Sequence, residues 1–287
     1  MTVVLLSLGA AALFGASSVL MHTQARAAPE AQSLRPGLLV HLARQPAWLA
    51  GIGAQTVGFG LQAVALEMGS LALVQALIPT GLLLALPLAA RTSGKRLGRS
   101  DWAGAVATVG GLAAFLAIAA PGKGRSTPSA QAWSVLLTTS LVVTGVLVLI
   151  GRRRLGPARA LALGTAAGTM LALTAAVTKV AGTRFSHGLG PGLASWEPYA
   201  LAIVGLSGLL LMQSSFQAGD IEWSLPALTV VNPVVSVIVG VTAFHEAISA
   251  PGLAVVALAA SLAVTVTGVV FLARSPALVA IHEKAVP

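Results

Sequence analysis

The chain has 287 residues, of which 56% are hydrophobic and 9% are charged, and its formal net charge is +9. Soluble domains carry about 25% charged residues, so this composition excludes a fold whose whole surface faces water. The sequence contains no cysteine, which excludes disulfides, thiol nucleophiles and thiolate metal ligands.

Nine stretches of the chain contain no Asp, Glu, Lys, Arg or His, and each is 19 to 21 residues long. A helix needs about 20 residues to cross a hydrocarbon layer about 30 Å thick, so each stretch predicts one membrane crossing. The predicted fold is an all-α, polytopic transmembrane bundle of about nine helices. In chain order the stretches are 3–21, 46–66, 70–90, 102–120, 132–150, 160–178, 198–216, 224–243 and 252–272.

The first stretch also has a feature of a secretory signal, because Ala25, Arg26 and Ala27 resemble a cleavage site. A cleaved signal has a basic start and an apolar run of roughly 7–15 residues, whereas no positive charge precedes this longer run. We therefore expect a retained membrane helix. Residues 30–45 follow it, and their charged side chains favour an amphipathic helix at the interface, with a short tenth crossing as the alternative.

The lysines and arginines are distributed unequally between alternate loops. With the N-terminus outside, 13 of the 17 lie on the cytoplasmic side, and the other four are Lys123, Arg125, Lys179 and Arg184. Cytoplasmic loops favour positive residues, so we expect a multi-pass protein of the plasma (inner) membrane with a cytoplasmic C-terminus. All five tryptophans lie within three residues of the start of a stretch, as interfacial side chains do. The net charge then reflects membrane topology and lipid contact, and it requires no nucleic-acid partner.

The second half of the sequence repeats the order of the first. The segment from Leu13 resembles that from Leu171, and the segment from Gln62 resembles that from Gln213 in its length and its closing Ala-Leu. Each partner lies five crossings later, so the two copies enter the membrane in opposite directions. Inverted repeats are common in transporters that alternate access, and the alternative is a duplication in a protein with another role. The predicted boundaries are 1–120 for the first repeat, 121–157 for a linking helix with its loops, 158–274 for the second, inverted repeat and 275–287 for a cytoplasmic tail.

Three segments carry a family resemblance: FGASSV from Phe14, ALEMGSLALVQAL from Ala65 and SLPALTVVNPVVSVIVG from Ser224. In them the chain resembles the drug/metabolite transporter superfamily, whose EamA-like repeat gives five plus five helices. It also resembles the NIPA-type branch, which is usually drawn with nine helices and whose members are described as magnesium transporters. The resemblance implies a small-molecule carrier in which 22–45 and 182–197 stand in place of the second helix of each half.

Two prolines, Pro79 and Pro233, each occupy the tenth position of a stretch. Proline leaves a backbone carbonyl without its helical partner, and in a membrane such a group must face protein or a water-filled cavity. Interrupted helices at matching positions favour a central substrate site, with kinks for packing as the alternative. The predicted pathway residues are Gln75, Pro79, Thr80, Thr229, Asn232 and Pro233, together with Gln62, Gln213 and Glu67. The last three have alternative roles, in interhelical hydrogen bonds for the two glutamines and in an interfacial turn for the glutamate.

No carboxylate lies within any of the nine stretches, whereas a dehydrated Mg²⁺ usually takes at least one carboxylate oxygen. The pathway residues offer amide, hydroxyl and carbonyl oxygens, which suit a neutral or zwitterionic metabolite or a hydrated ion. We therefore expect a carrier of a small organic solute, with divalent-cation transport and a non-transporting scaffold as the alternatives. No catalytic set of side chains converges in the sequence, so we expect neither an enzyme nor a cofactor or resident metal. Homo-oligomerisation is left open.

Overall fold

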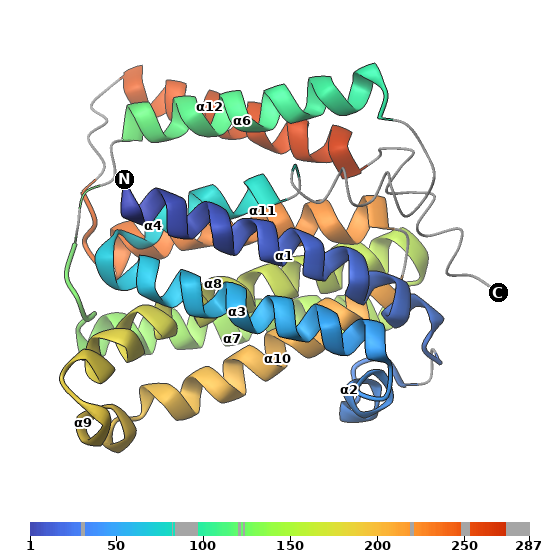
Figure 1. Ribbon diagram of the computed structural model, residues 1–287, viewed down its shortest axis with the longest axis horizontal. Coiled ribbons are helices and arrows are strands. Elements are labelled where there is room, and N and C mark those ends of the chain that lie inside the picture. Colours follow the sequence, from blue (N-terminus) through green and yellow to red (C-terminus); the bar gives the residue numbers. More distant parts are fainter. Residues whose placement is uncertain are drawn as a thin grey trace.

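The computed structural model describes residues 1–29, 32–81, 83, 97–119, 122, 124–218, 221–247 and 253–273, and Figure 1 shows their arrangement. Every regular element in these residues is a helix. The long helices are α1 (Thr2–Ala27), α3 (Pro46–Met68), α6 (Arg99–Ala119), α7 (Ala130–Arg153), α8 (Gly156–Ser186), α10 (Glu197–Ala218), α11 (Ile221–Thr242) and α12 (Leu253–Ala273). The short elements are α2 (Pro36–Leu42), α4 (Leu71–Leu77), the 3-10 helix η2 (Ile78–Thr80) and α9 (Leu189–Ala194).

Seven helices in the described residues are long and apolar enough to cross a membrane, namely α1, α3, α6, α7, α8, α10 and α12. Two shorter apolar helices, Leu71–Thr80 and Ala227–Thr242, fall within the stretches predicted at 70–90 and 224–243. The remainder of the first of these stretches lies largely outside the described residues. The prediction of an all-helical, multi-pass membrane bundle is confirmed at this level.

The surface of the bundle is apolar, as contact with lipid requires. Val106 on α6, Ile203 on α10 and Val256 on α12 are all mostly exposed. Soluble monomers rarely expose large apolar areas, so these side chains indicate helices that face a hydrocarbon environment.

The helices pack in pairs that recur in the two halves of the chain. Helix α1 packs on α3, and α8 packs on α10. Helix α1 also contacts α4 and α10, whereas α8 contacts α11 and α3. Helix α4 lies against α11, α6 lies against α12, and α7 packs on α8. In the view of Figure 1, the α6–α12 pair forms a layer above α1 and α11, with α3 and α10 below them.

Small residues let α6 and α12 approach closely. A Cβ atom on Gly111 would lie 2.6 Å from Oγ1 of Thr265, and a Cβ atom on Gly268 would lie 2.5 Å from Oγ1 of Thr108. The glycine of each helix therefore meets the threonine of the other. Because the order of these contacts is reversed along the second helix, α6 and α12 run antiparallel and cross about a local two-fold axis. Close backbone approach at small residues is the usual way in which membrane helices pack.

Two helices differ from the predicted stretches. The stretch 160–178 predicts a crossing that ends before Lys179, but α8 continues to Ser186 and buries this lysine. The prediction that Lys179 lies in an outer loop is therefore wrong, because a buried carboxylate pairs with it, as described below. The expected break is present at Pro79, where α4 gives way to η2, but α11 runs unbroken through Pro233.

The segments 22–45 and 182–197 each contain one short helix. Helix α2 has seven residues and α9 has six, whereas a crossing needs about 20. Helix α2 buries Leu38 and Leu42 and packs on α10, so it lies against the bundle and makes no tenth crossing. Figure 1 shows α2 and α9 at opposite ends of the bundle.

Candidate functional site

Two of the predicted pathway glutamines lie inside the bundle without polar partners. Gln75 on α4 and Gln213 on α10 are fully buried, and neither side-chain amide has a hydrogen-bond partner among the described residues. A buried polar group without a partner costs about 1–3 kcal/mol, so most buried amides are satisfied. Gln62 on α3 is also buried. Among the described residues, the two amides therefore remain available as hydrogen-bond donors and acceptors.

The polar residues next to the two prolines make local hydrogen bonds. The Thr80 hydroxyl donates to the carbonyl oxygen of Leu77 at 2.7 Å, within the turn that contains Pro79. On α11, the Ser236 hydroxyl donates to Oδ1 of the buried Asn232 at 3.4 Å. The Thr80 hydroxyl beside Pro79 is therefore satisfied within its own turn.

The remaining predicted residues lie at different depths. Pro233 is buried, Thr229 is half-buried, and Glu67 is exposed at the end of α3. Within the described part of the chain, no hydrogen bond joins one predicted pathway residue to another. The structure places these residues on α3, α4, α10 and α11, and their role in a pathway stays a prediction.

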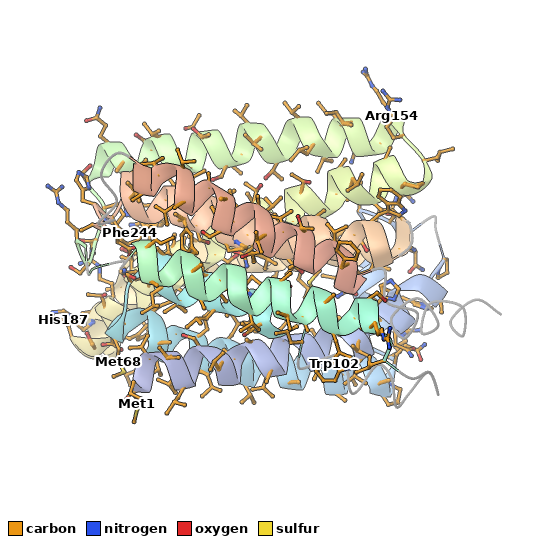
Figure 2. All side chains as sticks on the ribbon, turned by 90° about the horizontal axis from the view of Figure 1, so that it is seen from above. Met1, Met68, Trp102, Arg154, His187 and Phe244 are labelled. Carbon is orange, nitrogen blue, oxygen red and sulfur yellow. The ribbon has the colours of Figure 1, made fainter. Side chains whose placement is uncertain are left out.

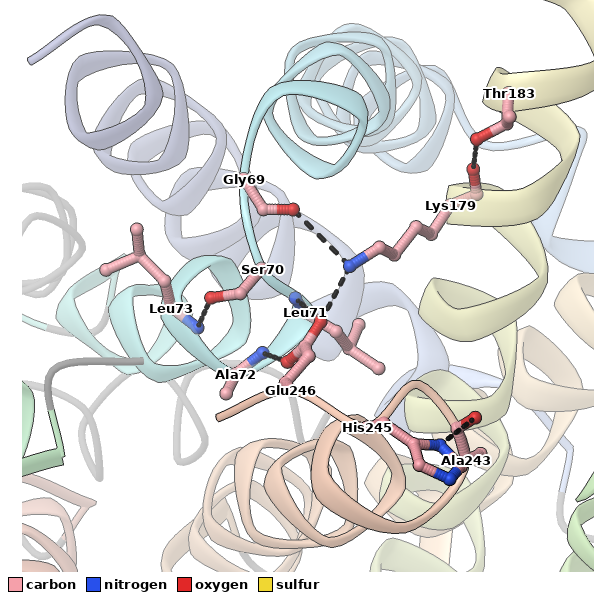
Figure 3. A network of polar contacts seen from close by, with 10 residues as sticks. All are labelled: Gly69, Ser70, Leu71, Ala72, Leu73, Lys179, Thr183, Ala243, His245 and Glu246. Carbon is pink, nitrogen blue, oxygen red and sulfur yellow. Dashed lines mark hydrogen bonds and ion pairs between the residues drawn. The ribbon is translucent and has the colours of Figure 1, made fainter. Parts of the chain in front are cut away.

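The carboxylate of Glu246, which lies between the stretches 224–243 and 252–272, meets the start of α4. Glu246 follows α11, and its Oε1 accepts from the backbone N–H of Leu71 at 2.6 Å, while its Oε2 accepts from that of Ala72 at 2.9 Å. Nζ of Lys179, on α8, donates to the same Oε1 at 2.6 Å (Figure 3). One carboxylate therefore joins α4, α8 and the segment after α11.

Both charged side chains are removed from solvent, with Lys179 6% exposed and Glu246 2% exposed. Buried charges persist when they are paired and hydrogen-bonded. Nζ of Lys179 also lies 3.4 Å from the carbonyl oxygen of Gly69 and 4.9 Å from the ring centre of Phe244. The ring face adds a cation–π attraction, and the first N–H groups of α4 favour the negative charge of Glu246.

The backbone after α11 aims Glu246 at α4. His245 has a left-handed backbone conformation with φ 54°, and the N–H of Glu246 donates to the carbonyl of Gly240 at 2.9 Å. A Cβ atom on Gly240 would collide with Oε2 of Glu246, so an alanine there would displace the carboxylate. The N–H of Arg125 donates to the carbonyl of Phe244 at 2.6 Å, which ties the loop before α7 to the same segment.

A second ion pair lies at the same end of the bundle. Nε of Arg184 is 3.3 Å from Oε1 of Glu197, which links α8 to α10. The Arg184 side chain is 49% exposed, whereas that of Glu197 is 1% exposed. Figure 2 shows His187 and Phe244, the neighbours of the two ion pairs, at this end. The second pair does not involve α4, so it offers a comparison for the first.

A cavity of about 690 Å³ lies between α7, α8 and α11. Arg125 and His245 line one part of it and Ser140 and Thr169 another, but none of the predicted pathway residues lines it. Within the described ranges, no three His, Asp or Glu side chains come together as metal ligands would.

Charges at the ends of the predicted stretches are the sequence signal for the Lys179–Glu246 pair. Lys179 comes directly after the stretch 160–178, and Glu246 follows the stretch 224–243 on the same predicted side of the membrane. Glu67 and Glu197 also lie at stretch ends on that side. The sequence therefore could not select Glu246 as the partner.

The chain is similar to a protein of Corynebacterium glutamicum that is described as uncharacterized. The two are 30% identical over 275 residues, which cover 95% of this chain and 94% of the relative. No family model matches the chain. No solved structure matches it.

Proposed function

This chain belongs to the same family as the Corynebacterium glutamicum protein, and we propose that it is a transporter that moves a small organic solute across the membrane. It works by alternating access between two inverted halves, residues 1–120 and 158–274. Its place in the drug/metabolite transporter superfamily is part of the proposal and rests on the three motif segments in the sequence.

The observation that carries the proposal is the reciprocal crossing of α6 and α12. A two-fold axis that relates two antiparallel membrane helices lies in the plane of the membrane, which is the symmetry of inverted repeats. The sequences TVGG from Thr108 and TVTG from Thr265 place the same threonine and glycine at the crossing in both helices. This sequence match supports the pairing of α6 with α12 as equivalent elements.

The packing of the other helices supports the same symmetry. If α1, α3 and α4 correspond to α8, α10 and α11, then the α1–α3 contact corresponds to α8–α10, and α1–α4 corresponds to α8–α11. The contact of α1 with α10 likewise corresponds to that of α8 with α3. The short helices α2 and α9 lie at opposite ends of the bundle, as inverted halves would place them (Figure 1).

We assign the end of the bundle that contains Met68 to the outside. Figure 2 shows Met68, His187 and Phe244 at one end and Trp102 and Arg154 at the other. This alternation supports the predicted loop assignment, in which the arginine-rich end faces the cytoplasm. The Lys179–Glu246 contact then lies at the outer end of the pathway.

The buried amides support an uncharged or zwitterionic organic solute as the cargo. Gln75 and Gln213 offer both donors and acceptors that have no partner in the part of the chain that the structure describes. A solute that formed hydrogen bonds with them would remove the cost of burying them empty. The buried carboxylate of Glu246 is already engaged by three donors, so it is a poor ligand for a divalent cation.

Transport by purified protein in liposomes tests the proposal. Uptake of a panel of radiolabelled amino acids, amines and other small metabolites is measured beside uptake of Mg²⁺, with empty liposomes as the control. We expect uptake of at least one organic solute and a loss of that uptake in Gln75→Leu and Asn232→Ala. Flux of Mg²⁺ alone would show that the cargo is a divalent cation and not an organic solute. The absence of any flux would overturn the proposal.

A further inference from the structure

We propose that Lys179 and Glu246 form the outer gate of this transporter. Their contact holds α4 against α8 and the segment after α11, and it breaks each time the central site opens to the outside. This inference rests on the proposed function, since a gate has meaning only for a site with access from both sides.

The contact is placed to hold the start of α4. Both carboxylate oxygens of Glu246 accept from the first turn of this helix, at 2.6 Å from the N–H of Leu71 and 2.9 Å from the N–H of Ala72. Lys179 then joins the carboxylate to α8, the long central helix. Gln75, one of the two unpaired pathway amides, lies one turn further along α4. Movement of the first turn of α4 would therefore open a route to Gln75.

The other end of α4 is held differently. A Cβ atom on Gly81, directly after η2, would collide with the carbonyl oxygen of Ala11 on α1. This backbone contact fixes the inner end of the α4–η2 unit against α1. Among the described residues, no backbone hydrogen bond joins the first turn of α4 to the segment after α11. The hydrogen bonds that the first turn of α4 makes to the segment after α11 are therefore those of the carboxylate, and loss of the carboxylate removes them.

Hydration decides when the contact can break. Separation of the two buried charges without water would remove their attraction and leave each charge unsolvated, which is strongly unfavourable. The pair therefore stays in contact while no water reaches the outer end. When water reaches it, both charges are solvated and the pair can part. A substitution that removes one partner removes this bias toward the closed state and shifts the population toward the open one.

Thiol labelling in a chain that has no native cysteine tests the gate. The reporter is Gln75→Cys, labelled in right-side-out vesicles with a membrane-impermeant maleimide. We expect Glu246→Gln to raise the labelling rate at least about tenfold, which corresponds to a shift of about 1.4 kcal/mol. Gly240→Ala changes no charge but pushes a methyl group into Oε2, so it should raise the rate in the same direction. Exposed Glu67→Cys, which should label at one rate in all backgrounds, controls for the amount of accessible protein, and thermal unfolding in detergent checks that each variant is folded.

Two matched variants make the result specific. Glu197→Gln breaks the neighbouring ion pair without touching α4, and it should leave the labelling of Gln75→Cys unchanged. The exchanged pair Lys179→Glu with Glu246→Lys keeps both charges, but a lysine has no acceptor for the N–H groups of Leu71 and Ala72. The exchange should therefore label as fast as Glu246→Gln. An exchange that restores slow labelling would still support the gate, with the ion pair alone as its closing contact and no requirement for the N–H groups of Leu71 and Ala72.

Unchanged labelling in both Glu246→Gln and Gly240→Ala, with normal labelling of Glu67→Cys, would overturn the gate. If Glu246→Gln does not fold, Gly240→Ala and Lys179→Met decide the question by the same measurement. The labelling requires no solute flux. Flux without faster labelling would therefore count against the gate, whereas faster labelling without flux of any solute would count against the transport function.

Discussion

Thr108 of α6 and Thr265 of α12 make the same contact from opposite sides, since each threonine lies over the glycine of the other helix. The contact leaves no room for a side chain at either glycine. The two helices thus share one interface that is built twice from the same residue types. Its energetics can be tested one glycine at a time.

Substitution of Gly111 or Gly268 by alanine should destabilise the protein to a similar extent. The new Cβ atoms would lie 2.6 Å and 2.5 Å from threonine hydroxyls, and overpacking of this kind costs about 1–3 kcal/mol. Gly110 is the matched control, because a Cβ atom there meets nothing within 4 Å. Gly110→Ala should leave stability unchanged or slightly raised. Thermal unfolding in detergent measures all three, and equal curves for Gly110→Ala and Gly111→Ala would contradict the crossing.

Loss of Lys179 should cost far more stability than loss of Arg184. Lys179→Met leaves the carboxylate of Glu246 buried without its counter-charge, which costs about 3–5 kcal/mol. Arg184→Met also leaves a buried carboxylate, that of Glu197, but the Arg184 side chain is 49% exposed and its contact is screened by solvent, so its loss should cost less. Denaturant unfolding of the two variants in detergent compares them directly. Similar losses in both would show that burial does not distinguish the two pairs.

Gln75→Leu and Gln213→Leu should reduce transport without reducing stability. Each leucine removes a buried amide that has no partner among the described residues, so the free energy of unfolding should stay the same or rise by about 1–3 kcal/mol. Thr174→Val is the control, because the buried Thr174 hydroxyl donates to the carbonyl of Met170 at 2.7 Å within its own helix. This control should keep its transport rate. A loss of stability in the glutamine variants together with normal flux would assign these amides to packing.

Single cysteines should report the orientation of the bundle. Glu67→Cys and His187→Cys should react with an impermeant reagent added to intact cells, and Arg154→Cys should react only after the membrane is permeabilised. Figure 2 shows His187 and Arg154 at opposite ends of the bundle. Reaction of all three from one side would be incompatible with a bundle that spans the membrane in this way, and a reversed pattern would place the Lys179–Glu246 contact inside.

The helices could be predicted from charge-free stretches, because all nine stretches contain a described helix. The stretch 160–178 ends directly before a charged residue, and this placed Lys179 outside a helix, whereas it lies within α8. This lysine continues within α8 because Glu246, 67 residues later in the chain, neutralises it. No local window of sequence contains both partners, so the pair could only be found once the helices were packed.

The candidate site was predicted in part. The sequence identified Gln75 and Gln213 as buried polar residues, but whether an amide finds a partner depends on the neighbouring helix and not on its own stretch. The proposed inverted repeat is supported by one further match in the sequence. Thr108 with Gly111 and Thr265 with Gly268 share one spacing in two helices, and that spacing is visible in the sequence.

Helix α7 has no counterpart in the proposed duplication, yet it is joined to the segment that carries Glu246. The N–H of Gly122 donates to the carbonyl of Ala247 at 3.0 Å, and that of Arg125 donates to the carbonyl of Phe244 at 2.6 Å. A Cβ atom on Gly124, between them, would collide with the same Phe244 carbonyl. If Glu246 moves as the proposed gate requires, these two backbone hydrogen bonds must either move with it or break. In the proposed gate, the loop before α7 therefore restrains the movement of Glu246.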